Sequence, residues 1–189
     1  MTRIYDGPIF VGDSTGRIYP GPVSTMHHFE LHGYLDLPRE YNVTLIDLND
    51  YPARPLWILD NKKHPRPVNI IETFLDPDVY NISLTRLKTH GKFVTVTLGV
   101  KNMVMGSPIS HYKQKAADGR NEKVFMHSGA HHHLNVNMFF VAQHINVGLS
   151  VLDGLVGMEG NGPTAGTPVE HGVALAGRDV VAVDKVGTV

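Results

Sequence analysis

Residues 151–168, VLDGLVGMEGNGPTAGTP, constrain the fold of this chain more than any other segment. An apolar run ends at Asp153 and opens into a predicted loop with recurring glycines: Gly154, Gly157, Gly160, Gly162 and Gly166. Glycine permits positive φ and lets a ligand approach the main chain closely. In an open α/β sheet, ligands bind beyond the carboxyl ends of the strands. We therefore expect this loop to form one wall of a ligand crevice, although it matches neither the phosphate loop nor the strict dinucleotide fingerprint.

Strand-like and helical patterns alternate along the rest of the chain. Apolar runs predict strands near residues 9–12, 43–48, 68–73, 79–84, 149–152 and 173–176. Ser24 or Thr25 can cap a helix, residues 134–145 carry a helical stripe, and a last helix follows residue 179. Residues 93–105 fit a strand or a helix, and we favour a helix. Four prolines within residues 50–67 predict a long loop or small excursion.

This alternation predicts an α/β fold with a mostly parallel sheet flanked by helices, as a three-layer sandwich. The length of 189 residues suits a single domain, residues 1–189.

The composition excludes several classes of protein. A formal net charge of −1 and the lack of a long basic run argue against a nucleic-acid partner. With no cysteine, this chain cannot form a disulfide, use a thiolate nucleophile or ligate an iron–sulfur cluster through thiolates. The N-terminus lacks the apolar core of a signal peptide, and no apolar run is long enough to span a membrane. We therefore expect a soluble, cytoplasmic protein.

Polar residues follow several of the predicted strands, and in a parallel sheet they would share one edge. Each one alone fits a helix cap or a turn, but together they favour a polar cleft. One wall of this predicted cleft comprises Lys88, Thr89, His90, Lys101 and Asn102. The other comprises Asp153, Gly154, Gly157, Glu159, Gly160 and Gly162, with Asp13 and Thr15 between the walls.

Three residues of the cleft are candidates for catalysis: Lys88, His90 and Asp153. A lysine pairs with anionic oxygens, a histidine exchanges protons, and a carboxylate orients a ligand. The alternative for residues 88–92 is a basic loop with a surface histidine.

Twelve histidines suggest a metal site, and four of them crowd into residues 127–133. Adjacent histidines on a helix point about 100° apart, so His131, His132 and His133 cannot all bind one ion. The candidate ligands of a divalent metal are His90, His131 and Asp153. The alternative is a set of exposed histidines at a helix start.

Several blocks of this sequence are similar to a prokaryotic family known as domain of unknown function 362. The similarity rests on VGD at 11–13, IDLN at 46–49, LTRLKTHGKFVTVTLGVKNMVMG at 84–106, residues 151–168 and LAGRDVVAVD at 175–184. The resemblance implies an α/β fold and, in many relatives, an attached ferredoxin-like iron–sulfur module. Family members usually extend further at both ends, so we expect a partial family domain. Thr85 and Val180 stand where the family often has proline.

Three functions fit these observations. The leading one is a cleft that binds an anionic small molecule or a metal-bound cofactor, with a redox link implied only by the family. The second is a non-catalytic domain that docks an iron–sulfur electron carrier. The third is a histidine-rich metal-binding protein without catalysis.

Overall fold

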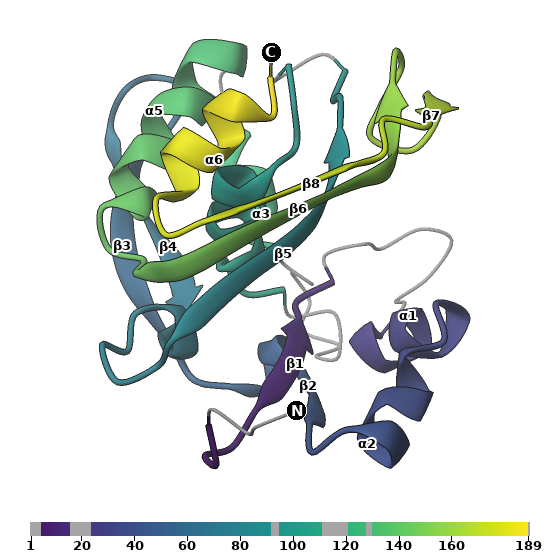
Figure 1. Cartoon of the computed structure of the whole chain (residues 1–189). Helices are drawn as coiled ribbons and strands as arrows, with labels where there is room; N and C mark the ends of the chain where they lie inside the picture. The colour runs from purple at the N-terminus through teal and green to yellow at the C-terminus, as the bar shows by residue number, and fades with distance from the viewer. Residues whose placement is uncertain (1–4, 16–23, 92–94, 111–120, 128–129, 189) are drawn as a thin grey trace.

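The computed structural model describes residues 5–15, 24–91, 95–110, 121–127 and 130–188. Its strands are β1 (Phe10–Asp13), β2 (Thr44–Asp47), β3 (Ala53–Leu59), β4 (Pro65–Ile71), β5 (Asn81–Lys88), β6 (Val147–Glu159), β7 (Thr167–Val169) and β8 (Val173–Gly177). Its α-helices are α1 (Thr25–Leu31), α2 (Leu37–Glu40), α3 (Gly99–Gly106), α4 (Lys123–Met126), α5 (Ala130–Ala142) and α6 (Val180–Val186). The fold is mixed α/β, as the sequence predicts (Figure 1).

The described residues form three separate sheets, which mix strand directions. Strands β1 and β2 pair in parallel, whereas β3 and β4 form an antiparallel hairpin. In the third sheet β5 pairs in parallel with β6, and β6 pairs antiparallel with both β7 and β8. The prediction of a mostly parallel sheet is therefore not confirmed.

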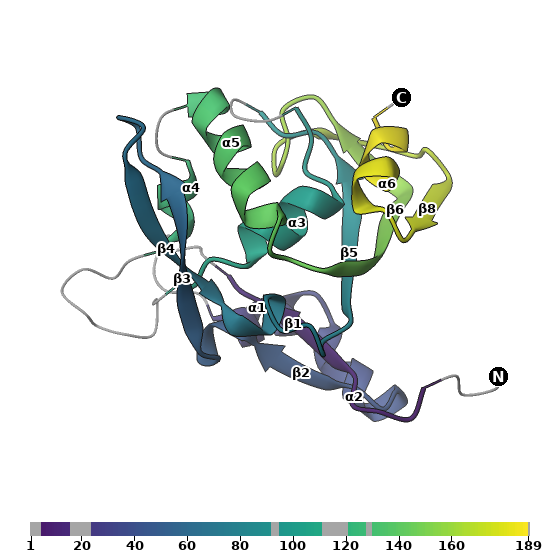
Figure 2. The ribbon, with the colours of Figure 1, turned by 90° about the vertical axis from the view of Figure 1, so that its left-hand side faces the viewer.

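Helices lie between two of these sheets. Helices α3 and α5 occupy the space between the β3–β4 hairpin and the β5–β6–β8 sheet, with α6 beside the latter (Figure 2). Buried Ile70 and Val68 of the hairpin pack in one core with Leu134 and Val141 of α5. A smaller core joins Leu98, Leu152 and Val183 below α6. The layer order is thus sheet, helices, sheet, rather than helices around one central sheet.

The proline-rich segment differs from its prediction. Residues 50–67 were expected to be a loop or excursion, but they contain β3 and the start of β4, which pair as a hairpin. Each strand of a two-stranded sheet has one unpaired edge, where a proline without an N–H is tolerated. Pro55, Pro65 and Pro67 all lie within this hairpin.

The glycine-rich loop also differs from its prediction. Gly154 and Gly157 lie inside the thirteen-residue strand β6, and the loop begins only at Gly160, which has φ of 74°. A Cβ on Gly154 would meet Val173 of the paired strand β8 at 2.9 Å. These strand glycines permit close packing of the chain on itself, so they are not a ligand-binding loop.

Candidate functional site

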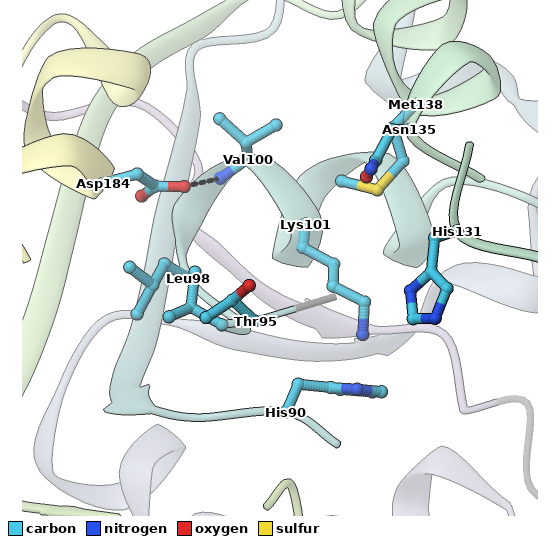
Figure 3. Close-up of a pocket in the computed structure, with 10 residues that line it drawn as sticks. His90, Thr95, Leu98, Val100, Lys101, His131, Asn135, Met138 and Asp184 are labelled. Carbon is cyan, nitrogen blue, oxygen red and sulfur yellow. Dashed lines mark hydrogen bonds between the residues drawn. The ribbon is translucent and has the colours of Figure 1, made fainter. Parts of the chain in front are cut away.

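A pocket of about 560 Å³ opens between α3, α5 and the residues that follow β5 (Figure 3). Strand β5 ends at Lys88, and His90 follows it directly. Helix α3 supplies Lys101, and α5 supplies His131 near its first turn. The residues that line the pocket are His90, Thr95, Val96, Leu98, Val100, Lys101, His131, Asn135, Met138 and Asp184.

Basic groups meet in this pocket. Burial lowers the pKa of Lys101 to about 8, and the nearby charge of Lys88 adds to this fall. Burial also lowers the pKa of Lys88, with a further contribution from Arg86. Loss of hydration disfavours an ammonium, and a second positive charge nearby disfavours it again. Lys101 and the nearby Lys88 therefore bring positive charge to this pocket, and both ammonium groups are held partly out of water.

The ring of His90 has a defined hydrogen-bonding role. Its Nδ1 lies 2.8 Å from the carbonyl oxygen of Gly91. Because a carbonyl can only accept, Nδ1 carries the proton and Nε2 of the neutral ring is left as a base. Burial lowers the pKa of His90, and Lys101 and His127 lower it further, while the Gly91 bond opposes them. The neutral form is thereby favoured at neutral pH.

Asp184 is an acidic residue in the pocket lining, and its carboxylate is already hydrogen-bonded to the backbone. Its two carboxylate oxygens accept hydrogen bonds from the backbone of Gly99 at 2.8 Å and Val100 at 2.9 Å. These are free N–H groups at the start of α3, which a carboxylate stabilises. Burial nevertheless raises the pKa of Asp184, against the opposing effect of these two hydrogen bonds. Asp184 therefore caps a helix of the pocket (Figure 3).

One lysine with a buried ammonium group, Lys123, was not predicted from the sequence. Lys123 Nζ lies 2.8 Å from Ser14 Oγ, 2.9 Å from the Met105 carbonyl oxygen and 3.0 Å from that of Gly106. Burial lowers the pKa of Lys123 to about 7, and Asp13 opposes the fall. The carbonyl of Lys123 contacts Nδ1 of His127 at 2.9 Å. This lysine ties the end of β1 to the end of α3.

The structure brings together part of the predicted cleft. His90, Lys101 and His131 line the pocket, and Lys88 lies close enough to affect the first two electrostatically. Thr89 turns away, since its Oγ1 donates to the Gly160 carbonyl at 3.0 Å. The segment from Gly160 to Gly162 thus supports the backbone beside His90, and Gly91 N–H donates to the Gly162 carbonyl at 2.9 Å.

Other predicted residues lie outside the pocket lining. Asp153 is in the middle of β6, 4.0 Å from Arg86 of the paired strand. Glu159 pairs with His171 at 3.7 Å. Asn102 Nδ2 donates to Ser83 Oγ at 3.2 Å. The residues of the predicted second wall do not line this pocket, and β6 runs on past Asp153 to Glu159.

Asp13 and Thr15 belong to the end of the β1–β2 sheet, where Asp13 aligns with Asp47. Buried Thr15 receives a hydrogen bond on its carbonyl from Asn49 Nδ2, 3.3 Å away. The predicted shared edge is therefore divided between sheets, since β1 and β2 do not pair with β5 or β6.

The predicted metal site is not supported. Within the described part of the chain, no three His, Asp or Glu residues are placed to hold a metal ion. His90 and His131 line one pocket, but Asp153 is paired with Arg86 on β6. At the start of α5, His131 and His132 are exposed, as in the alternative interpretation of this cluster.

Comparison with protein families adds an assignment. The model of the family described as Domain of unknown function (DUF362) matches residues 2–189. The chain belongs to this family. This confirms the resemblance carried by residues 84–106, 151–168 and 175–184.

A curated relative is the Thylakoid-associated protein sll1697 of Synechocystis sp., 31% identical over 185 residues. The alignment covers 96% of this chain and 50% of the relative, so the chain spans about half the length of that protein. No solved structure matches the chain significantly. Among the described residues, no helix is long and apolar enough to cross a bilayer.

Proposed function

We propose that this DUF362 chain binds a small organic anion in the pocket between α3 and α5. The observation that carries the proposal is the convergence of Lys101, His90 and His131 on one cavity, with Lys88 close by. A cavity of about 560 Å³ is in the size range of pockets that bind metabolites. Burial and the nearby charge of Lys88 lower the pKa of Lys101, and a bound anion would offset the repulsion between these two cations.

The hydrogen bonds of Asp184, the acidic residue of the lining, support the same proposal. The Asp184 carboxylate accepts two backbone hydrogen bonds at the start of α3, so it is committed to that helix. A ligand carboxylate or phosphate could accept from the Lys101 ammonium, whose hydrogen bond to Thr97 Oγ1 is 3.2 Å long. Charge-assisted hydrogen bonds of this kind are stronger than neutral ones. The pocket therefore favours an anion over a neutral ligand of equal size.

The test is isothermal titration calorimetry of the full chain with oxalate and with inorganic phosphate. Lys101→Met removes the central charge and should weaken binding by about tenfold to a hundredfold, since a hydrogen bond to a charged group contributes about 1.5–3 kcal/mol. Lys185→Met is the matched control, because it makes the same change at an exposed position on α6.

The control should bind as the parent protein does. Equal affinity of the parent and the Lys101→Met variant for both anions would refute the proposal, as would equal weakening by both substitutions. Circular dichroism of each variant establishes that the fold is retained.

A further inference from the structure

We propose that Lys101 captures the carbonyl carbon of a 2-oxo acid, forming a reversible imine through its Nζ atom. This inference rests on the proposed anion site and names the class of ligand that the site takes. It requires an accessible amine, a neighbouring cation for the carboxylate, and a base to move protons. The pocket supplies the amine and the base, and Lys88, which lies near Lys101, supplies the cation.

The position of Lys101 meets the first requirement. It is half-buried on α3 and lines the 560 Å³ pocket, so its Nζ faces a space that a small ligand can enter. Figure 3 shows its chain extending across the pocket, with His90 below its tip and His131 to one side. The interaction with Thr97 Oγ1 comes from one turn earlier on the chain and steadies the amine in this position.

The charge balance favours a nucleophilic amine. With a pKa of about 8, Lys101 is neutral in about a quarter of molecules at pH 7.5, compared with about one in a thousand for a lysine of pKa 10.5. Burial and an adjacent cation are the two features that activate lysines for imine formation. Lys88 and His90 are the titratable basic groups that interact electrostatically with Lys101. The Asp184 carboxylate lines the same pocket and is held by Gly99 and Val100.

The bond changes balance without an oxidant or a metal. The Lys101 Nζ lone pair attacks the carbonyl carbon, the carbonyl oxygen takes up a proton, and a carbinolamine forms. The carbon–oxygen bond then breaks, one water leaves, and a carbon–nitrogen double bond remains. Nε2 of His90 can accept the proton that nitrogen loses and return it to the departing oxygen, because Nδ1 is held by the Gly91 carbonyl. Lys88 provides a positive charge for the ligand carboxylate.

The experiment traps the imine. The full chain is incubated with pyruvate and sodium cyanoborohydride, and the labelled lysines are identified by peptide mass spectrometry. We expect Lys101 to be labelled about tenfold or more faster than exposed Lys185, because Lys101 lines the pocket and burial lowers the pKa of its amine to about 8. Acetone, which has the carbonyl but no carboxylate, should label Lys101 more slowly than pyruvate does.

Two variants separate the possible causes. Lys101→Arg keeps a positive charge at this position but cannot form the imine, so it should lose the fast label. His90→Gln should slow the labelling of Lys101 while leaving Lys101 the preferred site. Equal rates at Lys101 and Lys185, or equal rates with pyruvate and acetone at Lys101, would overturn the inference. If oxalate binds but pyruvate gives no preferred label, the imine is refuted and the anion site stands; if oxalate does not bind, the proposed function itself fails.

Discussion

Replacement of the buried Lys123 by methionine should change how the stability of the protein depends on pH. Lys123 is enclosed by Ser14 and by the carbonyls of Met105 and Gly106, and its pKa falls from 10.5 to about 7 on burial. This difference corresponds to about 5 kcal/mol between the charged and neutral forms. In the unfolded chain the lysine regains its ordinary pKa, so the two states bind different numbers of protons.

The direction of the effect follows from that difference. Between pH 7 and about 10.5 the unfolded state holds a proton on Lys123 that the folded state has lost. The free energy of unfolding therefore rises with pH in this interval, by about 1.4 kcal/mol per pH unit once the folded lysine is neutral. Below pH 7 both states are protonated and this contribution no longer changes. The rise from pH 7 to pH 9.5 should reach about 3 kcal/mol.

Urea unfolding followed by circular dichroism, at pH 7, 8, 9 and 9.5, measures this rise. Lys123→Met should be less stable by about 1–3 kcal/mol at pH 7, since the Met105 and Gly106 carbonyls lose a donor. Its deficit should grow with pH, because methionine has no proton to lose. Lys101 contributes a rise of the same sign in both proteins, so the difference between the curves isolates Lys123.

Exposed Lys185→Met is the control and should follow the parent at every pH. If the parent and Lys123→Met curves stay parallel from pH 7 to 9.5, the burial argument is refuted. Should the Lys123→Met variant not fold, the parent curve can still refute the argument, although Lys101 adds to any rise. A flat parent curve over this interval contradicts a pKa near 7.

Two further substitutions test the framework around the pocket. Asn137 is fully buried on α5, and its side-chain amide hydrogen-bonds both the N–H and the carbonyl of Leu59 at 2.9 Å. Asn137→Ala should lower the free energy of unfolding in urea by about 2–4 kcal/mol. Asn135→Ala, at an exposed position on the same helix, should lower it little. A Cβ on Gly162 would lie 2.6 Å from the carbonyl carbon of Thr89, so Gly162→Ala should displace the chain next to the pocket. We expect a lower melting temperature and weaker oxalate binding. An unchanged affinity for oxalate would contradict this account.

Local signals in the sequence were sufficient for much of the fold. Ser24 accepts a hydrogen bond from His27 N–H at the start of α1, as a capping residue should. Leu134 and Val141 of the predicted stripe are buried on α5, which ends at Ala142, and the runs at 9–12 and 43–48 pair as β1 and β2. Lys88 and His90 were found because they follow a strong strand pattern. Lys101 was predicted on the same wall of the cleft, and it lines the pocket together with His90.

Tertiary structure decided the rest. Whether Gly154 and Gly157 belong to a loop or a strand depends on β8 and β5 packing against them, and that pairing has no local signal. The environment of Lys123 is similarly non-local, since its partners at Ser14 and Met105 are distant in sequence. From the sequence alone, a lysine within the polar residues 106–130 is expected to be exposed to solvent. The alternative role as a docking domain for an iron–sulfur protein stays a prediction.

The contact between Asp184 and the start of α3 links the last helix to the pocket. Asp184 is on α6, and through Gly99 and Val100 it fixes where α3 begins, two residues before Lys101. A shift of α6 along or away from its sheet would therefore translate the amine relative to His90. A partner that binds or displaces α6 would therefore change the reactivity of Lys101 without touching the ligand in the pocket. In this way Asp184 sets the alignment of Lys101 and His90, which lie more than eighty residues earlier in the sequence.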